Sequence, residues 1–252
     1  MQTNGREAPE HGGSQPVFLL PAAVTALVGL IVAIHLASVF VFSEQAYLRF
    51  VVWFGFIPVR LTAPELVPGG LAPMLWTPFT YALLHGGWEH LIFNVAWLAI
   101  FGTPVARRYG GLAMLIVFFV GSLAGAMAYL ALAWTSPIPL IGASGGIAAL
   151  TGAAVRFVFQ PVEVARHPET GEVVVLGRRL LPLGGLLRDG RAGLFSFFWL
   201  VLNGIVPLMP EFFGGPGVQI AWQAHIGGFV FGLLVVPLFE RRPPLPAQDP
   251  DE

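Results

Sequence analysis

One serine and one histidine in this chain lie in separate glycine-containing segments, and their side chains are suited to nucleophilic chemistry. Ser144 occurs in "IGASGGIAAL" and His225 in "WQAHIGGFVFG". A serine hydroxyl becomes a competent nucleophile when a neighbouring base accepts its proton, and imidazole is the base best matched to neutral pH. We therefore expect Ser144 and His225 to act as a nucleophile and its general base.

A third segment, "HGGWEHLIFN", supplies groups that could stabilise a negatively charged oxygen. His90 and Asn94 are spaced i, i+4 and so share one face of a helix. Ser144 is expected at a helix start, where backbone N–H groups are unpaired and the helix dipole is positive. Gly142 and Gly145 keep side chains away from the serine. The pattern predicts an oxyanion site formed by His90, Asn94 and the Ser144 amide.

Each of these features also has a purely structural interpretation. A Gly-Ala-Ser-Gly string in a membrane helix is most often a packing face, and its serine can bond back to a backbone carbonyl. A single histidine such as His35 is more often a buried structural residue, His85 could hydrogen bond only to the adjoining loop, and Glu89 could be solvated or paired. Four polar features expected at one membrane depth favour a shared site instead.

The elements that must position these residues are membrane-spanning helices. Of the 252 residues, 56% are hydrophobic and 11% charged, and the mean hydropathy is +0.75, which exceeds what a soluble domain buries. The composition predicts an all-α polytopic membrane protein. About 20 apolar residues are needed for each span, and six segments qualify: 17–42, 81–101, 112–134, 141–159, 192–209 and 218–238. The chain has no cysteine, which excludes disulfides and thiolate chemistry.

These spans define a membrane domain at 17–240 between an N-terminal tail at 1–16 and a C-terminal tail at 241–252. The loop 43–80 contains Trp53, Phe54 and Phe56, so we expect part of it to lie in the membrane interface. The polar insert 160–191 is expected to form a small hairpin.

Arginine placement predicts the orientation, since all thirteen basic residues are arginine. Basic residues near span ends favour the cytoplasmic side. If both termini are cytoplasmic, only Arg49 and Arg60 lie outside, and eleven arginines lie inside: Arg6, Arg107, Arg108, Arg156, Arg166, Arg178, Arg179, Arg188, Arg191, Arg241 and Arg242. The starts of the second, fourth and sixth spans then share the outer half of the membrane.

The segments "HGGWEHLIFN", "GASGG" and "AHIGGFVFG" resemble, in order, the three signature segments of rhomboid intramembrane serine proteases. "FGFIPVRL" and "IFG" also resemble bacterial members. The resemblance implies a six-helix rhomboid-like bundle in which Ser144 is the nucleophile and His225 the base, without an acidic third member. It also implies that His90 and Asn94 are oxyanion donors, and that neither a cofactor nor a metal is required.

The chain departs from the family pattern at two places. Many members carry an aromatic residue four positions after the serine, stacked on the base histidine, whereas this chain has Ala148. The family's Trp-Arg pair is not evident in loop 43–80. Gly228 and Gly232 share the His225 face of the sixth span, so we expect that face to pack closely on the fourth.

The resemblance implies hydrolysis of peptide bonds in or beside transmembrane segments. Substrates would be membrane proteins entering laterally from lipid, past a gate at the fifth span and residues 210–218, and the location would be a bacterial inner membrane. No nucleic-acid partner is expected. One alternative is a catalytically silent member that binds membrane proteins. A second is a proton or metal transporter using His85, Glu89, His90 and His225, which lacks an acidic relay.

Overall fold

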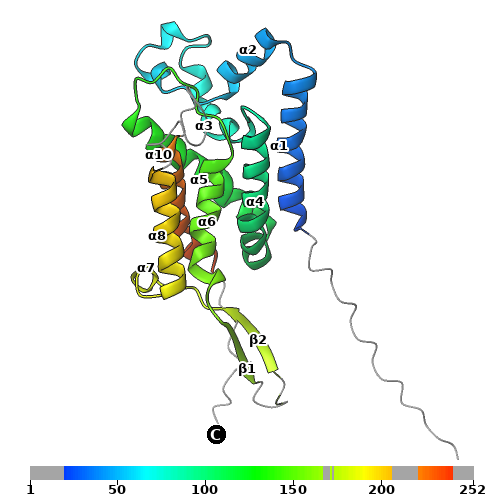
Figure 1. The fold of residues 1–252 in the computed structure, drawn as a ribbon, viewed down its shortest axis with the longest axis vertical. Coiled ribbons are helices and arrows are strands. Elements are labelled where there is room, and N and C mark those ends of the chain that lie inside the picture. The colour runs from blue at the N-terminus through cyan, green and yellow to red at the C-terminus, as the bar shows by residue number, and fades with distance from the viewer. Residues whose placement is uncertain (1–19, 167–170, 172, 206–220, 241–252) are drawn as a thin grey trace, which may run out of the picture.

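The chain forms a bundle of apolar helices, drawn in Figure 1. The computed structural model describes residues 20–166, 171, 173–205 and 221–240. Within these residues, four helical segments are long and apolar enough to cross a membrane: α1 (Ala22–Phe40), α4 (Trp88–Tyr109), α5 (Gly111–Leu132), and α10 (Trp222–Val235) with its extension η6 (Val236–Phe239). Two shorter apolar helices join them, α6 (Ser144–Val158) and α8 (Gly190–Ile205). The protein is an all-α polytopic membrane protein, as the composition predicts.

Helix α6 is the centre of the bundle. It packs against α4, α5 and α10, while α1 lies outside α4 and α8 lies against α10 and α6. Every residue from Gly145 to Phe157 is buried. At 1.5 Å per residue, its 15 residues extend over about 22 Å, which is less than the ~30 Å hydrocarbon core. One end of α6 therefore lies within the depth of the bundle, enclosed by longer helices.

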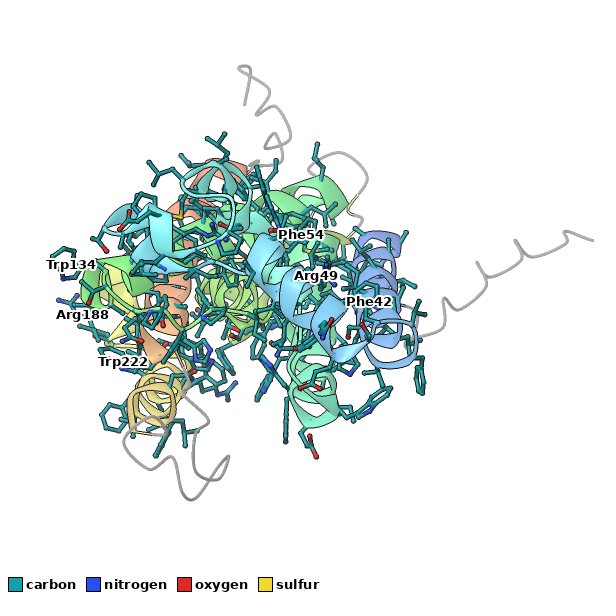
Figure 2. All side chains as sticks on the ribbon, turned by 90° about the horizontal axis from the view of Figure 1, so that it is seen from above. Phe42, Arg49, Phe54, Trp134, Arg188 and Trp222 are labelled. Carbon is teal, nitrogen blue, oxygen red and sulfur yellow. The ribbon has the colours of Figure 1, made fainter. Side chains whose placement is uncertain are left out.

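The loop 43–80 covers one end of the bundle with short helices: α2 (Glu44–Phe54), η1 (Pro58–Leu61), η2 (Pro64–Leu66), η3 (Ala72–Leu75) and α3 (Thr77–Thr80). Figure 2 looks down on this end and shows α2 lying across it, from near Phe42 beside α1 toward Phe54 closer to the middle. Leu48 is 56% exposed and Trp53 40% exposed. These apolar side chains suit the membrane interface, as expected for this loop.

The insert at the opposite end forms an antiparallel hairpin of β1 (Val162–Arg166) and β2 (Val173–Arg178), followed by α7 (Leu183–Leu186). Arg108, at the end of α4, joins the hairpin to the end of η6. Its Nη1 donates to the Arg178 carbonyl at 2.6 Å, and its Nη2 pairs with Glu240 at 2.6 Å. The Asp189 carboxylate accepts from the Ala192 amide at the start of α8, and this hydrogen bond lowers the pKa of the carboxyl.

Helix α4 differs most from its expected span, 81–101. Residues Tyr81–Leu83 form a short 3-10 helix, η4, and α4 begins only at Trp88, after Gly86 and Gly87, and continues to Tyr109. Two consecutive glycines favour an interruption because they lose the most conformational freedom on joining a helix. Three ends of expected spans lie outside the described residues: 17–19 of the first span, 206–209 of the fifth and 218–220 of the sixth.

Candidate active site

Ser144 is the first residue of α6, and the backbone before it makes a sharp turn at Gly142. Gly142 has φ +118°, a conformation that residues with a Cβ rarely adopt. A Cβ there would lie 2.6 Å from Cε1 and Nε2 of His90. Glycine is therefore required at this position for two reasons: its backbone can adopt the turn, and it leaves room for the His90 ring.

The side chains of Ser144 and His225 meet across the contact between α6 and α10. Nε2 of His225 lies 2.8 Å from Oγ of Ser144, a hydrogen-bond distance. When Nε2 is unprotonated, the hydroxyl donates to it, which is the arrangement that a general base needs. Two residues 81 positions apart in the chain thus form a pair with the geometry of a nucleophile and its base.

Glycines set the separation of these two helices. A Cβ on Gly228 would collide with the Gly145 carbonyl oxygen, and a Cβ on Gly232 would collide with that of Ala149. Ala148 belongs to the same contact between α6 and α10, because its Cβ is 3.3 Å from the Cβ position of Gly228. The side chain four residues after Ser144 is therefore part of the helix contact, and it is only 2% exposed. A larger side chain at position 148 would have to displace α10 locally.

His90 and Asn94 are on the neighbouring helix α4, and their side chains make contacts with different partners. The His90 ring approaches Gly142, as described above. The Asn94 side-chain amide donates to the His90 backbone carbonyl at 2.8 Å, one turn back in the same helix. The amide is thus engaged within α4, although Asn94 is buried and faces the bundle. The oxyanion roles of both residues stay predictions.

Tyr81 supports the turn before Ser144 and was not singled out from the sequence. Its carbonyl accepts from the Gly142 amide at 3.0 Å, and its hydroxyl donates to the Ser122 carbonyl at 2.8 Å. A Cβ on Gly145 would lie 2.6 Å from the Tyr81 hydroxyl oxygen. The only local signal was an aromatic residue four positions before His85, which by itself does not indicate this contact.

Arg60 holds the loop 43–80 together, a role that the sequence did not reveal. Its guanidinium is fully buried and donates to three backbone carbonyls, those of Val52 (2.6 Å), Pro68 (2.7 Å) and Gly70 (2.9 Å). The loop is joined to the segment before Gly142 by paired backbone hydrogen bonds between Phe56 and Leu140, at 2.8 and 3.1 Å. Arg60 therefore stabilises the fold of the loop 43–80, which covers the site.

The remaining ionisable candidates are not gathered around Ser144. His35 and His85 line a separate cavity, although the His85 ring lies 5.0 Å from the His90 ring, and Glu89 is exposed. Nδ1 of His225 has no hydrogen-bond partner among the described residues. Among the residues that the structure describes, no group of three or more His, Cys, Asp or Glu side chains is arranged to hold a metal ion. The proposed gate at 210–218 lies outside the described residues.

The fold and site together define a polytopic membrane protein with a serine and histidine pair enclosed between its helices. Residues 72–242 match the family model Rhomboid, described as a rhomboid domain, which covers more than half of the chain. The chain therefore belongs to the rhomboid family.

Several curated proteins are similar to the chain. The rhomboid protease GlpG of Pectobacterium atrosepticum is 29% identical over 161 residues, which cover 64% of this chain and 47% of that protein. Rhomboid-related protein 2 of Mus musculus is 27% identical over 163 residues, covering 64% and 46%. Rhomboid-related protein 3 of Homo sapiens is 34% identical over 83 residues, covering 33% and 20%. The chain thus aligns with less than half of the length of each of these relatives.

Proposed function

We propose that this rhomboid family member is an intramembrane serine endopeptidase that hydrolyses peptide bonds in or next to transmembrane segments. Ser144 is the nucleophile and His225 the general base. The observation that carries the proposal is the 2.8 Å separation of Ser144 Oγ and His225 Nε2 at the start of a buried helix. The matched protease from Pectobacterium supports the same reaction class.

The reaction proceeds through an acyl-enzyme. His225 Nε2 accepts the Ser144 proton as Oγ attacks the substrate carbonyl, and the imidazolium then protonates the departing amine. The developing oxyanion is stabilised by the N-terminus of α6, with His90 and Asn94 as further donors. The Asn94 amide has two N–H groups, and the one that is not donated to the His90 carbonyl serves this role. His225 then accepts a proton from a water molecule that attacks the ester, and the imidazolium returns this proton to Ser144 Oγ as the carboxylic acid product leaves.

The substrates are transmembrane proteins that reach the site laterally from lipid, because the pair is enclosed by apolar helices. A substrate must unwind locally, since a helical backbone engages its own carbonyls. We place both termini in the cytoplasm and the protein in a bacterial inner membrane, with the loop 43–80 on the outer side. This orientation follows from the distribution of arginine.

A second candidate is a catalytically silent family member that binds membrane proteins without cleaving them. One observation favours it: one of the two N–H groups of the Asn94 amide is donated to the His90 carbonyl, which leaves one fewer donor for a substrate oxygen. The two candidates differ in whether Ser144 is chemically reactive, so a reactivity assay separates them.

Labelling with a fluorophosphonate probe tests the proposal. Folded wild-type protein in detergent should be labelled, and Ser144→Ala and His225→Ala should each abolish labelling. Ser196→Ala is the matched control, because Ser196 is also a buried serine within a helix, hydrogen bonded back to the Ala192 carbonyl. Coexpression with tagged single-pass membrane proteins then tests cleavage. If the wild-type protein is not labelled and produces no Ser144-dependent fragments, the catalytically silent family member is favoured.

A further inference from the structure

A cavity of about 190 Å³ lies apart from the serine and histidine pair, where α1 and α2 meet the start of α4. Its lining includes His35 and Ser38 of α1, Tyr47 of α2, His85, and Gly87 and Trp88 at the start of α4. The volume has room for a group several times the size of a water molecule, at about 30 Å³ per water. The proteolytic mechanism proposed above uses none of these side chains.

Two histidines in this lining lack hydrogen-bond partners. His35 is 2% exposed and His85 is 3% exposed, and within the described residues both ring nitrogens of each are unpartnered. Buried polar groups are nearly always hydrogen bonded, and leaving one unsatisfied costs about 1–3 kcal/mol. Four unpartnered ring nitrogens beside one cavity indicate a polar occupant.

The start of α4 adds a second feature that favours a negatively charged occupant. Helix α4 has 22 residues, and its first residue, Trp88, follows Gly87, which provides no side-chain cap. The first backbone N–H groups of a helix have no partner within it, and the macrodipole makes this end positive. Phosphate groups bind at such ends. The two neutral histidines and the hydroxyl of Tyr47 can each donate a further hydrogen bond, whereas the Ser38 hydroxyl already donates to the His35 carbonyl at 2.7 Å.

The rim of the cavity is apolar and outward facing. Val39 and Trp88 are each 44% exposed, and Phe40 beside them is 74% exposed. In a membrane protein these side chains face acyl chains, and Trp commonly lies at headgroup level. A cavity that offers two buried histidine side chains and a helix N-terminus, and that has an apolar rim, matches a molecule with a charged headgroup and hydrocarbon tails.

We propose that this cavity binds a phosphate group, and that a phospholipid headgroup at the α2 end of the bundle supplies it. His35, His85 and the N-terminus of α4 hold the phosphate oxygens, and the acyl chains lie along the exposed apolar side chains of α1 and α4. The proposal concerns binding alone and does not depend on proteolytic activity.

Glu89 allows a test of whether the group bound in the cavity is negatively charged. It is an exposed acidic residue in the first turn of α4, and its carboxylate oxygen lies 3.7 Å from the Cβ position of Gly87. It does not line the cavity, but it is close enough to repel an anion bound there. Glu89→Gln should therefore strengthen phosphate binding, whereas it would leave the binding of a neutral molecule unchanged.

The test is a titration of full-length protein, labelled with ¹⁵N-histidine, in phosphate-free dodecyl maltoside. The chain has only six histidines, so single variants assign the side-chain signals. Short-chain phosphatidylglycerol should shift the His35 and His85 signals saturably. His35→Leu and His85→Leu should each weaken binding by about tenfold or more, because hydrogen bonds to charged groups are strong. Thr25→Val is the control, since Thr25 is an exposed α1 residue whose hydroxyl bonds to Pro21.

Comparison ligands distinguish the source of the phosphate from the chemistry of the site. Stronger binding of the lipid than of inorganic phosphate supports the headgroup assignment, while equal binding of both overturns it in favour of a free phosphate ion. Equal shifts with a short-chain diacylglycerol, which has no phosphate, would overturn the whole proposal, as would no shift at all. His85→Asn, which keeps a donor, should bind better than His85→Leu, and thermal unfolding checks that each variant is folded.

Discussion

In the proposed mechanism Ser144 and His225 act as one chemical unit, because the hydroxyl is a weak nucleophile until the imidazole accepts its proton. Residues that act as a unit lose function non-additively. We therefore expect Ser144→Ala and His225→Ala each to reduce cleavage of a tagged transmembrane substrate to background, with the double variant no slower. Residual proteolysis by purified Ser144→Ala protein, free of contaminating protease, would contradict the assigned nucleophile.

Asn94 tests the oxyanion site more cleanly than His90, because the His90 ring also fills the space beside Gly142. Removing the Asn94 amide should lower kcat by about 10²-fold, the scale measured for a lost oxyanion donor at other sites. The measurement is the cleavage rate of Asn94→Ala at saturating substrate, with thermal unfolding as the control for folding. An unchanged kcat would show that the hydrogen bond to His90 is the whole role of this side chain.

At the scale of elements, the contact between α6 and α10 determines whether the Ser144 and His225 side chains can meet. Gly228 has no room for even a methyl group beside the Gly145 carbonyl. Gly228→Ala should push α10 away, and a displacement of about 1 Å can cost on the order of 10²-fold in rate. Cleavage rate and thermal unfolding should be measured together, since activity is expected to fall much further than stability.

Gly29→Ala is the matched control for Gly228→Ala. Gly29 also lies within an apolar helix, but a Cβ there meets nothing within 4 Å. It should leave activity unchanged. If Gly228→Ala behaves like Gly29→Ala, this glycine does not set the distance between the two reacting side chains.

Arg60 acts on the loop 43–80 as a whole. Arg60→Met leaves three backbone carbonyls without their buried donor, and it should lower the free energy of unfolding by about 3 kcal/mol. Denaturant unfolding in mixed micelles measures this loss. Arg49→Met is the control, because Arg49 on α2 is exposed and bonds only within its own helix (Figure 2). Equal stability of the two variants would contradict the role given to Arg60.

At the scale of the whole molecule, the bundle has two chemically different ends, one covered by the loop 43–80 and the other carrying the hairpin (Figure 1). The arginine distribution predicts that the hairpin is cytoplasmic. The native chain has no cysteine, so a single introduced thiol reports the side on which it lies. Leu66, which is 72% exposed, and Glu163 on β1 are suitable positions at the two ends.

In intact spheroplasts, a membrane-impermeant maleimide should label Leu66→Cys but not Glu163→Cys. Permeabilisation should expose Glu163→Cys, and the unsubstituted chain, which has no cysteine, is the background control. The reverse labelling pattern would invert the orientation and place the proposed active site nearer the cytoplasmic face.

The sequence by itself determined the class of protein and the segments that carry the candidate site residues. Hydropathy and helical spacing are local properties, so they predict apolar helices and place His90 and Asn94 on one face without knowledge of the fold. The three glycine-containing segments also predict which side chains are candidates, because a lone serine beside glycines and a histidine in an apolar span are recognisable in isolation.

Only the tertiary structure decided which of these residues meet. The 2.8 Å contact of Ser144 with His225 depends on how closely α6 and α10 pack, and the burial of Arg60 depends on how the loop 43–80 closes around it. The support from Tyr81 and the placement of His35 and His85 beside one cavity were likewise invisible in the sequence. Each arises from contacts between segments distant in the chain, and local residue patterns carry no information about the relative positions of such segments.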